Sequence, residues 1–299
     1  MEQNSTKIIG SKNIPIGLKR KPTKRGLKFK PNGDGTCELI GTGSFLEKEV
    51  LIPAKYKGMI VTAIGEEAFR NCKTITKIII PGCIMRIGAS AFRDCSELTS
   101  VMLYNGVTHI GEYAFCGCLA LRSIIIPETV TSIGKWAFYW CRNLTDAVIC
   151  NGVERIGDYM FCQCNHLNHV MIPESVTTIG ESAFSGCEGL TGMTVPESVT
   201  NVGVSAFRNC SGLTSMTIPE SMTSIVPGMF WDCAHLTSIE IPKSVTSFGD
   251  CSFCDCKNLR DIRYNGTTAQ WNAISKEGNW KTNVPAKEVI CSDGTVYLS

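Results

Sequence analysis

The stretch Ile133-Gly134-Lys135-Trp136-Ala137-Phe138-Tyr139-Trp140-Cys141-Arg142-Asn143-Leu144 is the middle copy of a unit that recurs along most of this 299-residue chain. Self-similarity at a fixed period of about 20 to 50 residues is the signature of a solenoid, in which each unit packs mainly on its neighbours. The period therefore predicts an extended array. The phenylalanines of the unit show this period. They lie 23 residues apart, at Phe69, Phe92, Phe115, Phe138, Phe161, Phe184, Phe207, Phe230 and Phe253.

Each unit contains one short strand signal. Ile124-Ile125-Ile126-Pro127 is a β-branched run that ends at proline, which lacks the donor needed to continue a strand. Because strand side chains alternate, Ile124 and Ile126 point one way and Ile125 the other. Gly134 is interpreted as the residue that lets the chain turn tightly. Stacked strands, about 4.8 Å apart, predict a parallel sheet along one side of a curved rod.

The points at which the 23-residue period begins and ends divide the chain into four segments. Residues 1–26 read as a flexible basic tail, 27–60 as an N-terminal cap with the first strand, 61–265 as the repeat array and 266–299 as a C-terminal cap. Within the last segment, residues 268–276 predict a short helix. Residues 288–297 predict a closing hairpin, because an Asp-Gly pair lies between two apolar runs.

The charge distribution is uneven. Residues 1–30 carry nine Lys/Arg and one acid, a net charge of +8, so the remainder of this +2 chain carries −6. These residues lack the apolar core of a signal peptide, which leaves a cytoplasmic location open. No stretch is apolar enough to span a membrane. Nucleic-acid binding by the tail is disfavoured, since its first 26 residues contain no aromatic side chain for stacking.

The seventeen cysteines do not follow the pattern of a disulfide framework. Nine share the 23-residue period, each three positions after a phenylalanine, and are interpreted as small buried side chains. Parallel Cβ vectors about 4.8 Å apart disfavour disulfides within this column. Pairing of the other eight is left open; these are Cys37, Cys83, Cys116, Cys150, Cys162, Cys251, Cys254 and Cys291.

The sequence offers no convincing metal or catalytic site. Cys162, Cys164, His166 and His169 superficially match zinc-ligand spacing, but their repeat positions predict that the side chains diverge. The cysteine side chains around Cys251 are likewise predicted to diverge, and no histidine lies among them. No nucleophile, base and orienting acid share a fixed position. We therefore expect no enzyme activity, no metal and no cofactor.

The repeat unit IPESVTSIG-x-x-AF-x-x-C-x-x-LTS-x-x, present in 172–194 and 218–240, resembles the BspA-type leucine-rich repeat. IPAKYKGMIVTAIGEEAF (52–69) and the C-terminal YNGTTAQWNAI with VICSDG resemble modules that flank such arrays in bacterial proteins. The resemblance covers about residues 30–299. It implies a leucine-rich-repeat solenoid of the α/β type, with short parallel strands, turns and short helical segments. It also implies a cell-surface or secreted protein that binds other proteins.

Two surfaces are candidate binding sites. The first is an apolar stripe on the predicted concave face, formed by the outward strand positions Ile79, Met102, Ile125, Val148 and Met171. Exposed apolar stripes usually mark contacts. The alternative is that these residues are simply strand formers packed side by side. The second is an aromatic patch, for which local packing on the convex side is the alternative. It comprises Tyr113, Trp136, Tyr139, Trp140 and Tyr159.

These features favour a non-enzymatic protein-binding scaffold, active in adhesion or in contact with a host or partner protein. The alternative is a structural solenoid that self-associates through the apolar stripe. The partner's identity and the oligomeric state do not follow from the sequence.

Overall fold

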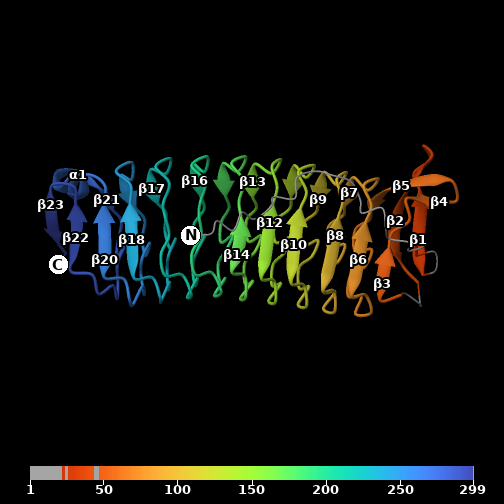
Figure 1. Ribbon diagram of the computed structural model, residues 1–299, viewed down its shortest axis with the longest axis horizontal. Coiled ribbons are helices and arrows are strands. Elements are labelled where there is room, and N and C mark those ends of the chain that lie inside the picture. Colours follow the sequence, from red (N-terminus) through yellow and green to blue (C-terminus); the bar gives the residue numbers. More distant parts are fainter. Residues whose placement is uncertain (1–21, 24–25, 44–46, 299) are drawn as a thin grey trace, which may run out of the picture.

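The chain winds into an elongated rod with the repeats stacked along its long axis (Figure 1). This computed structural model describes residues 22–23, 26–43 and 47–298. The predicted solenoid is confirmed. Most of the segment that the sequence predicts to be a flexible tail, residues 1–26, lies outside the described residues.

The predicted parallel strands form a main row along one face (Figure 1). Corresponding residues of successive repeats lie side by side, as in the pairing of Ile125 with Val148 and of Val148 with Met171. The first part of the row is a six-stranded sheet of β3 (Glu49–Leu51), β6 (Lys77–Ile80), β8 (Ser100–Leu103), β10 (Ser123–Ile126), β12 (Asp146–Ile149) and β14 (His169–Met171). The second part contains β18 (Ser238–Ile241), β20 (Asp261–Tyr264), β22 (Glu288–Cys291) and β23 (Gly294–Tyr297).

A second row of two-residue strands runs beside the first, and the sequence analysis missed it. Most of these strands end on a buried apolar residue, as at Ile110 and Ile156. The exceptions are Ile133, which is partly buried, and Lys276. The row consists of β7 (Arg86–Ile87), β9 (His109–Ile110), β11 (Ser132–Ile133), β13 (Arg155–Ile156), β15 (Thr178–Ile179), β16 (Asn201–Val202), β17 (Ser224–Ile225), β19 (Ser247–Phe248) and β21 (Ser275–Lys276). Two residues are too few for a period-2 pattern to be recognised.

Both ends of the rod are sealed by irregular elements. At the N-terminal end, β1 (Leu27–Pro31) pairs antiparallel with β2 (Thr36–Thr42), and β4 (Lys55–Tyr56) pairs with β5 (Met59–Ile64), which continues into the second row. At the other end β22 and β23 form the expected hairpin. Helix α1 (Thr268–Ala273) is shorter than the predicted 268–276, because Ser275–Lys276 forms a strand with β19 instead.

The phenylalanine column forms the core. All nine rings are at most 1% exposed, and neighbouring rings stack with centroids 4.9 to 5.9 Å apart. This spacing follows from a parallel ladder, whose strands lie about 4.8 Å apart. A single repeat could not bury its own ring, so the ladder exists only in the stacked array.

The periodic cysteines form a second ladder with a role beyond filling space. In eight repeats the thiol donates to the carbonyl of the phenylalanine 26 residues earlier, at 3.0 to 3.2 Å, as in Cys141 to Phe115 and Cys164 to Phe138. Burial raises the pKa of Cys187, and it raises the pKa of Cys210 to about 12. Each cysteine therefore joins two repeats through a neutral S–H group.

This burial predicts which thiols react. In the native protein, N-ethylmaleimide should label the four partly exposed cysteines, Cys72, Cys83, Cys150 and Cys251, well before the ladder thiols, because the ladder thiols are buried. Mass spectrometry of digested protein after timed labelling measures this order. Labelling in urea provides the control, since all seventeen should then react. Early native labelling of Cys141 or Cys187 would contradict the ladder.

The turns around each phenylalanine are not helical, contrary to the short helical segments that the resemblance implies. Within the described residues, α1 in the C-terminal cap is the one α-helix. Two positions per repeat, two before and two after the phenylalanine, have positive φ, for example Trp136 at 56° and Trp140 at 63°. Left-handed residues stop helix propagation. The residue type at the second of these positions indicates the positive φ. It is Asn, Asp or Gly in seven of nine repeats, and these residues adopt positive φ more readily than others.

The repeat glycine has a different role from the predicted tight turn. Gly134 is not in the left-handed region; a Cβ there would lie 2.7 Å from the carbonyl carbon of Gly111 in the preceding repeat. The position therefore requires glycine because two backbones approach closely. Val226 replaces this glycine in one repeat. The second row is interrupted before that repeat, between β16 and β17, and also between β11 and β13, where the glycine is retained as Gly157.

Candidate binding surface

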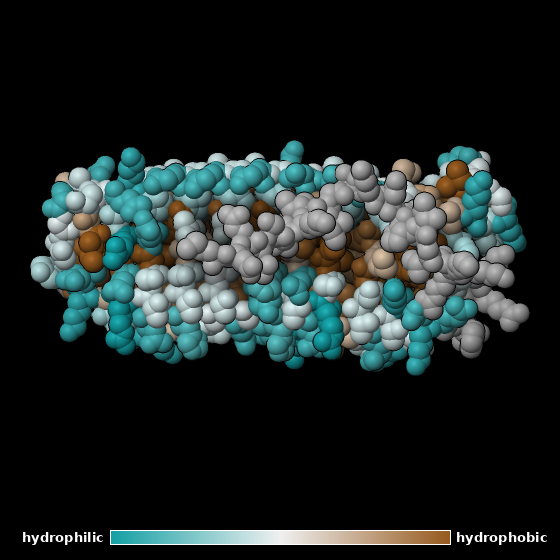
Figure 2. Space-filling model, viewed as in Figure 1, coloured by the Kyte–Doolittle hydropathy of each residue, from teal (hydrophilic) through white to brown (hydrophobic). Residues whose placement is uncertain are grey.

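The outward side chains of the main row define what we call the strand face. Figure 2 shows apolar residues in a band along the rod, between polar rows at its edges. The five predicted stripe residues differ in exposure. Ile125 and Met171 are each 60% exposed, Met102 and Val148 are half-buried, and Ile79 is 3% exposed. Ile79 therefore offers no accessible surface, and the usable stripe is centred on β10, β12 and β14.

The main row is interrupted next to this stripe. β14 is the last strand of its sheet, and within the described residues no bridge joins it to residues 191–195. Only isolated bridges connect Thr194 to Thr217 and Thr217 to Glu240, after which β18 resumes the row. The inward position here is Met193 and then Met216, where other repeats have mostly β-branched residues. Methionine is a weaker strand former, so the sequence is locally consistent with the break.

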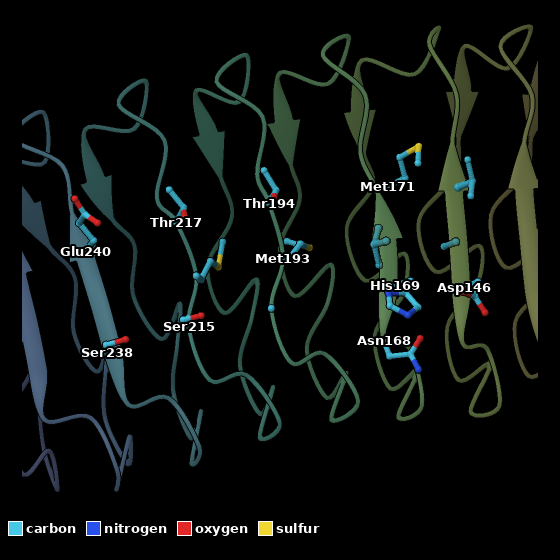
Figure 3. A pocket seen from close by; sticks show the side chains of 15 residues that line it. Asp146, Asn168, His169, Met171, Met193, Thr194, Ser215, Thr217, Ser238 and Glu240 are labelled. Carbon is cyan, nitrogen blue, oxygen red and sulfur yellow. The ribbon is translucent and has the colours of Figure 1, made fainter. Parts of the chain in front are cut away.

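A hollow of about 680 Å³ lies over this interruption (Figure 3). Its floor includes the buried Met193 and Met216, and Gly192 contributes no side chain, which deepens it. Met171 lines it beside the apolar stripe, and Glu240 lies at the opposite end (Figure 3). The hollow and the stripe therefore form one continuous surface, which the sequence analysis did not predict.

The lining offers both polar and apolar contacts. Hydroxyl groups of Thr194, Ser215, Thr217 and Ser238 line the hollow and can donate or accept hydrogen bonds. His169 is exposed at its edge. The neighbouring Asp146 carboxylate accepts a hydrogen bond from the Thr145 hydroxyl at 2.6 Å, which fixes its orientation. Such a mixture suits a polypeptide, whose backbone requires hydrogen-bond partners while its side chains fill apolar surface.

The aromatic patch is a ladder rather than an open platform. Tyr113, Trp136 and Tyr159 stack face to face, with centroids 4.9 and 5.3 Å apart. The Arg93 guanidinium lies 5.1 Å from the centre of the Tyr113 ring and covers its outer side. At the other end, the Tyr159 hydroxyl donates to Glu181, a bond that raises the pKa of the tyrosine. The ring faces therefore contact one another, and the ring edges are what remains for a partner.

Tyr139 and Trp140 do not join this ladder. Burial raises the pKa of Tyr139, whose side chain is partly covered. Trp140 is 40% exposed, and the Arg142 guanidinium lies 4.6 Å from its ring centre. The five aromatic residues therefore do not form one continuous exposed patch. Much of their contact area is used within the protein.

The cysteine and histidine side chains that matched zinc spacing are separately engaged. The Cys164 thiol donates to the Phe138 carbonyl, and His166 Nδ1 lies 2.8 Å from the Arg142 carbonyl oxygen. His169 faces the hollow instead. A search of the described residues finds no group of three or more potential ligands arranged to hold a metal ion. Among the same residues, no helix is both long and apolar enough to cross a bilayer.

Comparison with known proteins connects this architecture to a family. The model described as BspA type leucine rich repeat region matches residues 62–191 and 177–281, in six copies. A leucine rich cell surface protein from Faecalibacterium prausnitzii A2-165 has a similar structure, with a TM-score of 0.64 and 25% identity over 86% of this chain and 97% of that one. No curated protein matches the chain significantly.

Two further solved structures resemble the chain more distantly. A leucine-rich repeat protein from Bacteroides ovatus ATCC 8483 is 24% identical, with a TM-score of 0.42, over 91% of each chain. The leucine rich repeat protein of T. pallidum is 20% identical, with a TM-score of 0.47, over 88% of this chain and 100% of that one.

Proposed function

Because this chain belongs to the BspA-type leucine-rich repeat family, we propose that it is a non-catalytic scaffold that binds another protein through its strand face. The observation that carries the proposal is the exposure of Ile125 and Met171, 60% each, beside the hollow lined by hydroxyl groups. An exposed apolar stripe next to convergent polar groups is typical of a contact surface.

The stripe and the hollow have complementary roles in this proposal. Burial of Ile125 and Met171 by a partner supplies the apolar contribution, about 25 cal/mol for each Å² removed from water. The hydroxyl groups around Thr194 and Ser215 accept hydrogen bonds from the partner's backbone or donate hydrogen bonds to it, and these bonds fix the position of the partner. Met171 and Met193 have flexible side chains that adjust to an irregular surface.

The partner is proposed to lie outside the cell. The related Faecalibacterium protein is described as a cell surface protein, and the fold is shared over most of both chains. This resemblance and the exposed strand face support the proposal of an adhesive role, toward a host protein or another bacterium. We propose the edges of the aromatic ladder around Trp136 as a second, smaller contact.

Replacing both Ile125 and Met171 by glutamate should weaken partner binding at least about tenfold, because two charged groups would replace apolar contacts at the centre of the proposed interface, and a loss of about 1.4 kcal/mol is tenfold. Folding should be retained, since both side chains are largely exposed. Cross-linking capture from surface extracts of host cells, compared between wild type and variant, identifies the partner. The captured protein is then purified and its affinity measured by titration.

The matched control is Val204→Glu. Val204 is 46% exposed on a different part of the repeat, where the equivalent positions are Glu112 and Glu181, so glutamate is tolerated there. This variant should bind like wild type. Equal affinities for all three proteins would exclude the strand face as the contact. Unfolding of the double variant would instead mean that the stripe is internal.

Self-association through the same stripe is the alternative. A rod with Ile125 exposed on its main row can pair with a second copy, which would bury both stripes. Light scattering at two concentrations distinguishes the two functions. A concentration-dependent dimer that disappears in the Ile125→Glu/Met171→Glu variant would favour self-association over a dedicated partner.

A further inference from the structure

The last repeat contains two cysteines whose positions face each other. They lie in Cys251-Ser252-Phe253-Cys254, two residues before and one residue after the core phenylalanine. A turn joins them, in which the Cys254 amide donates to the Cys251 carbonyl at 3.3 Å. Such a turn brings the first and fourth Cα atoms within about 7 Å of each other, which overlaps the range for a disulfide.

The repeat itself provides independent evidence that these two side chains meet. In the first repeat the same two positions are occupied by Glu67 and Arg70, which form an ion pair. In the last repeat the neighbouring Cys254 thiol raises the pKa of Cys251 to about 11. The repeat geometry therefore places the two cysteine side chains on the same side of the turn.

The two thiols differ in accessibility. Cys251 is partly exposed, whereas Cys254 is 2% exposed and donates to the Asn279 carbonyl at 3.0 Å. Asn279 is held from its other side by the Asp250 carboxylate, which accepts its amide hydrogen at 3.1 Å. One thiol can thus meet a reagent from solvent, while the other contacts both its partner and the C-terminal cap.

We propose that Cys251 and Cys254 form a modification site at which a hydroperoxide closes an intra-turn disulfide. The Cys251 thiolate attacks one peroxide oxygen, so that an S–O bond forms while the O–O bond breaks and the leaving alkoxide or hydroxide takes a proton. Cys254 then attacks the sulfur of this sulfenic acid. The S–S bond forms, the S–O bond breaks, and the released hydroxide takes the Cys254 proton to give water. Two thiols are oxidised and one peroxide is reduced.

The rate of the first step depends on pH. Only the thiolate is nucleophilic, and the raised pKa of Cys251 leaves little thiolate near neutrality. Oxidation should therefore be slow at pH 7 and accelerate about tenfold for each pH unit up to the pKa. The site is thus suited to gradual oxidation in an oxidising environment rather than to rapid sensing.

Oxidation also changes a contact of the cap. Once Cys254 is in a disulfide, it has no S–H group to donate to Asn279. The carbonyl of Asn279 then loses this hydrogen bond, while the bond from its amide to Asp250 remains. The thiol state of the last repeat is in this way connected to the segment that closes the rod.

The test uses the full chain treated with hydrogen peroxide at pH 8, quenched with catalase, alkylated in urea and digested with trypsin without reduction. The peptide 244–257 contains Cys251, Cys254 and Cys256. We expect it to lose two hydrogen atoms and to carry a single alkyl group, on Cys256. Cys251→Ser and Cys254→Ser should each abolish this product, whereas Cys256→Ser should retain it.

The peptide 94–122 is an internal control. It also contains three cysteines, and Cys116 occupies the position of Cys254, but Tyr113 replaces the partner cysteine. It should remain fully alkylated under the same conditions. The proposal is overturned if peptide 244–257 is oxidised no faster than 94–122, if the disulfide includes Cys256, or if Cys251 proceeds to a sulfinic acid without pairing.

Discussion

Replacing Phe138 by alanine should lower the free energy of unfolding by about 3–5 kcal/mol, the largest effect expected of any single core change. The ring is fully buried and stacks between Phe115, at 5.3 Å, and Phe161, at 5.5 Å. Its removal leaves a cavity in the middle of the array. The flanking rings cannot close this cavity, because the strand pairing on both sides fixes the spacing of the repeats.

Phe69→Ala is the matched comparison. Phe69 begins the ladder within the described residues and stacks on Phe92 alone, at 4.9 Å. With one ring neighbour instead of two, its replacement should cost less. Urea unfolding followed by circular dichroism and by tryptophan fluorescence measures both variants. Equal and small losses would contradict the stacked ladder, and a larger loss at Phe69 would place the weakest point of the array at its N-terminal end.

The sequence predicted the fold where one residue type recurs at one position. Phe138 and Cys141 are such residues, and their burial follows from the period alone. The prediction from sequence was incomplete where the structure depends on backbone conformation rather than on residue type. The two-residue strand Ser132–Ile133 is too short to show a pattern. The left-handed turns contradict the propensity of Trp136, which rarely adopts positive φ.

The candidate surface was predictable only in outline. Strand alternation correctly directs Ile125 and Met171 to solvent, but it assigns the same direction to Ile79, which is buried. Exposure depends on what else packs on a face, and a local pattern does not contain that information. The hollow beside Met171 arises from a loss of pairing between β14 and residues 191–195, a long-range property of two repeats.

The second large effect on stability is expected when a methyl group is added at a repeat glycine. Gly134→Ala should destabilise the protein by about 1–3 kcal/mol or more, because overpacking in a fixed core forces the backbone to move. The new Cβ would lie 2.7 Å from the Cα atom of Glu112 and from the carbonyl carbon of Gly111. Both atoms belong to the backbone of the preceding repeat, so a change of side-chain rotamer cannot relieve the contact.

The response should be measurable in the second row itself. The Gly134 amide donates to the Ile110 carbonyl at 2.8 Å, and Gly134→Ala should weaken this hydrogen bond. Hydrogen exchange should therefore become faster at residue 134, in addition to the loss measured by urea unfolding.

Gly192→Ala separates this effect from the general consequence of replacing glycine. Its φ lies outside the left-handed region, and the nearest atom to a new Cβ is the Ser215 carbonyl oxygen at 3.7 Å, an ordinary contact. Alanine should be neutral there or stabilising by up to about 1 kcal/mol, because it restricts the unfolded chain. If both variants lost the same stability, the close approach of successive repeats would not be what requires glycine at position 134.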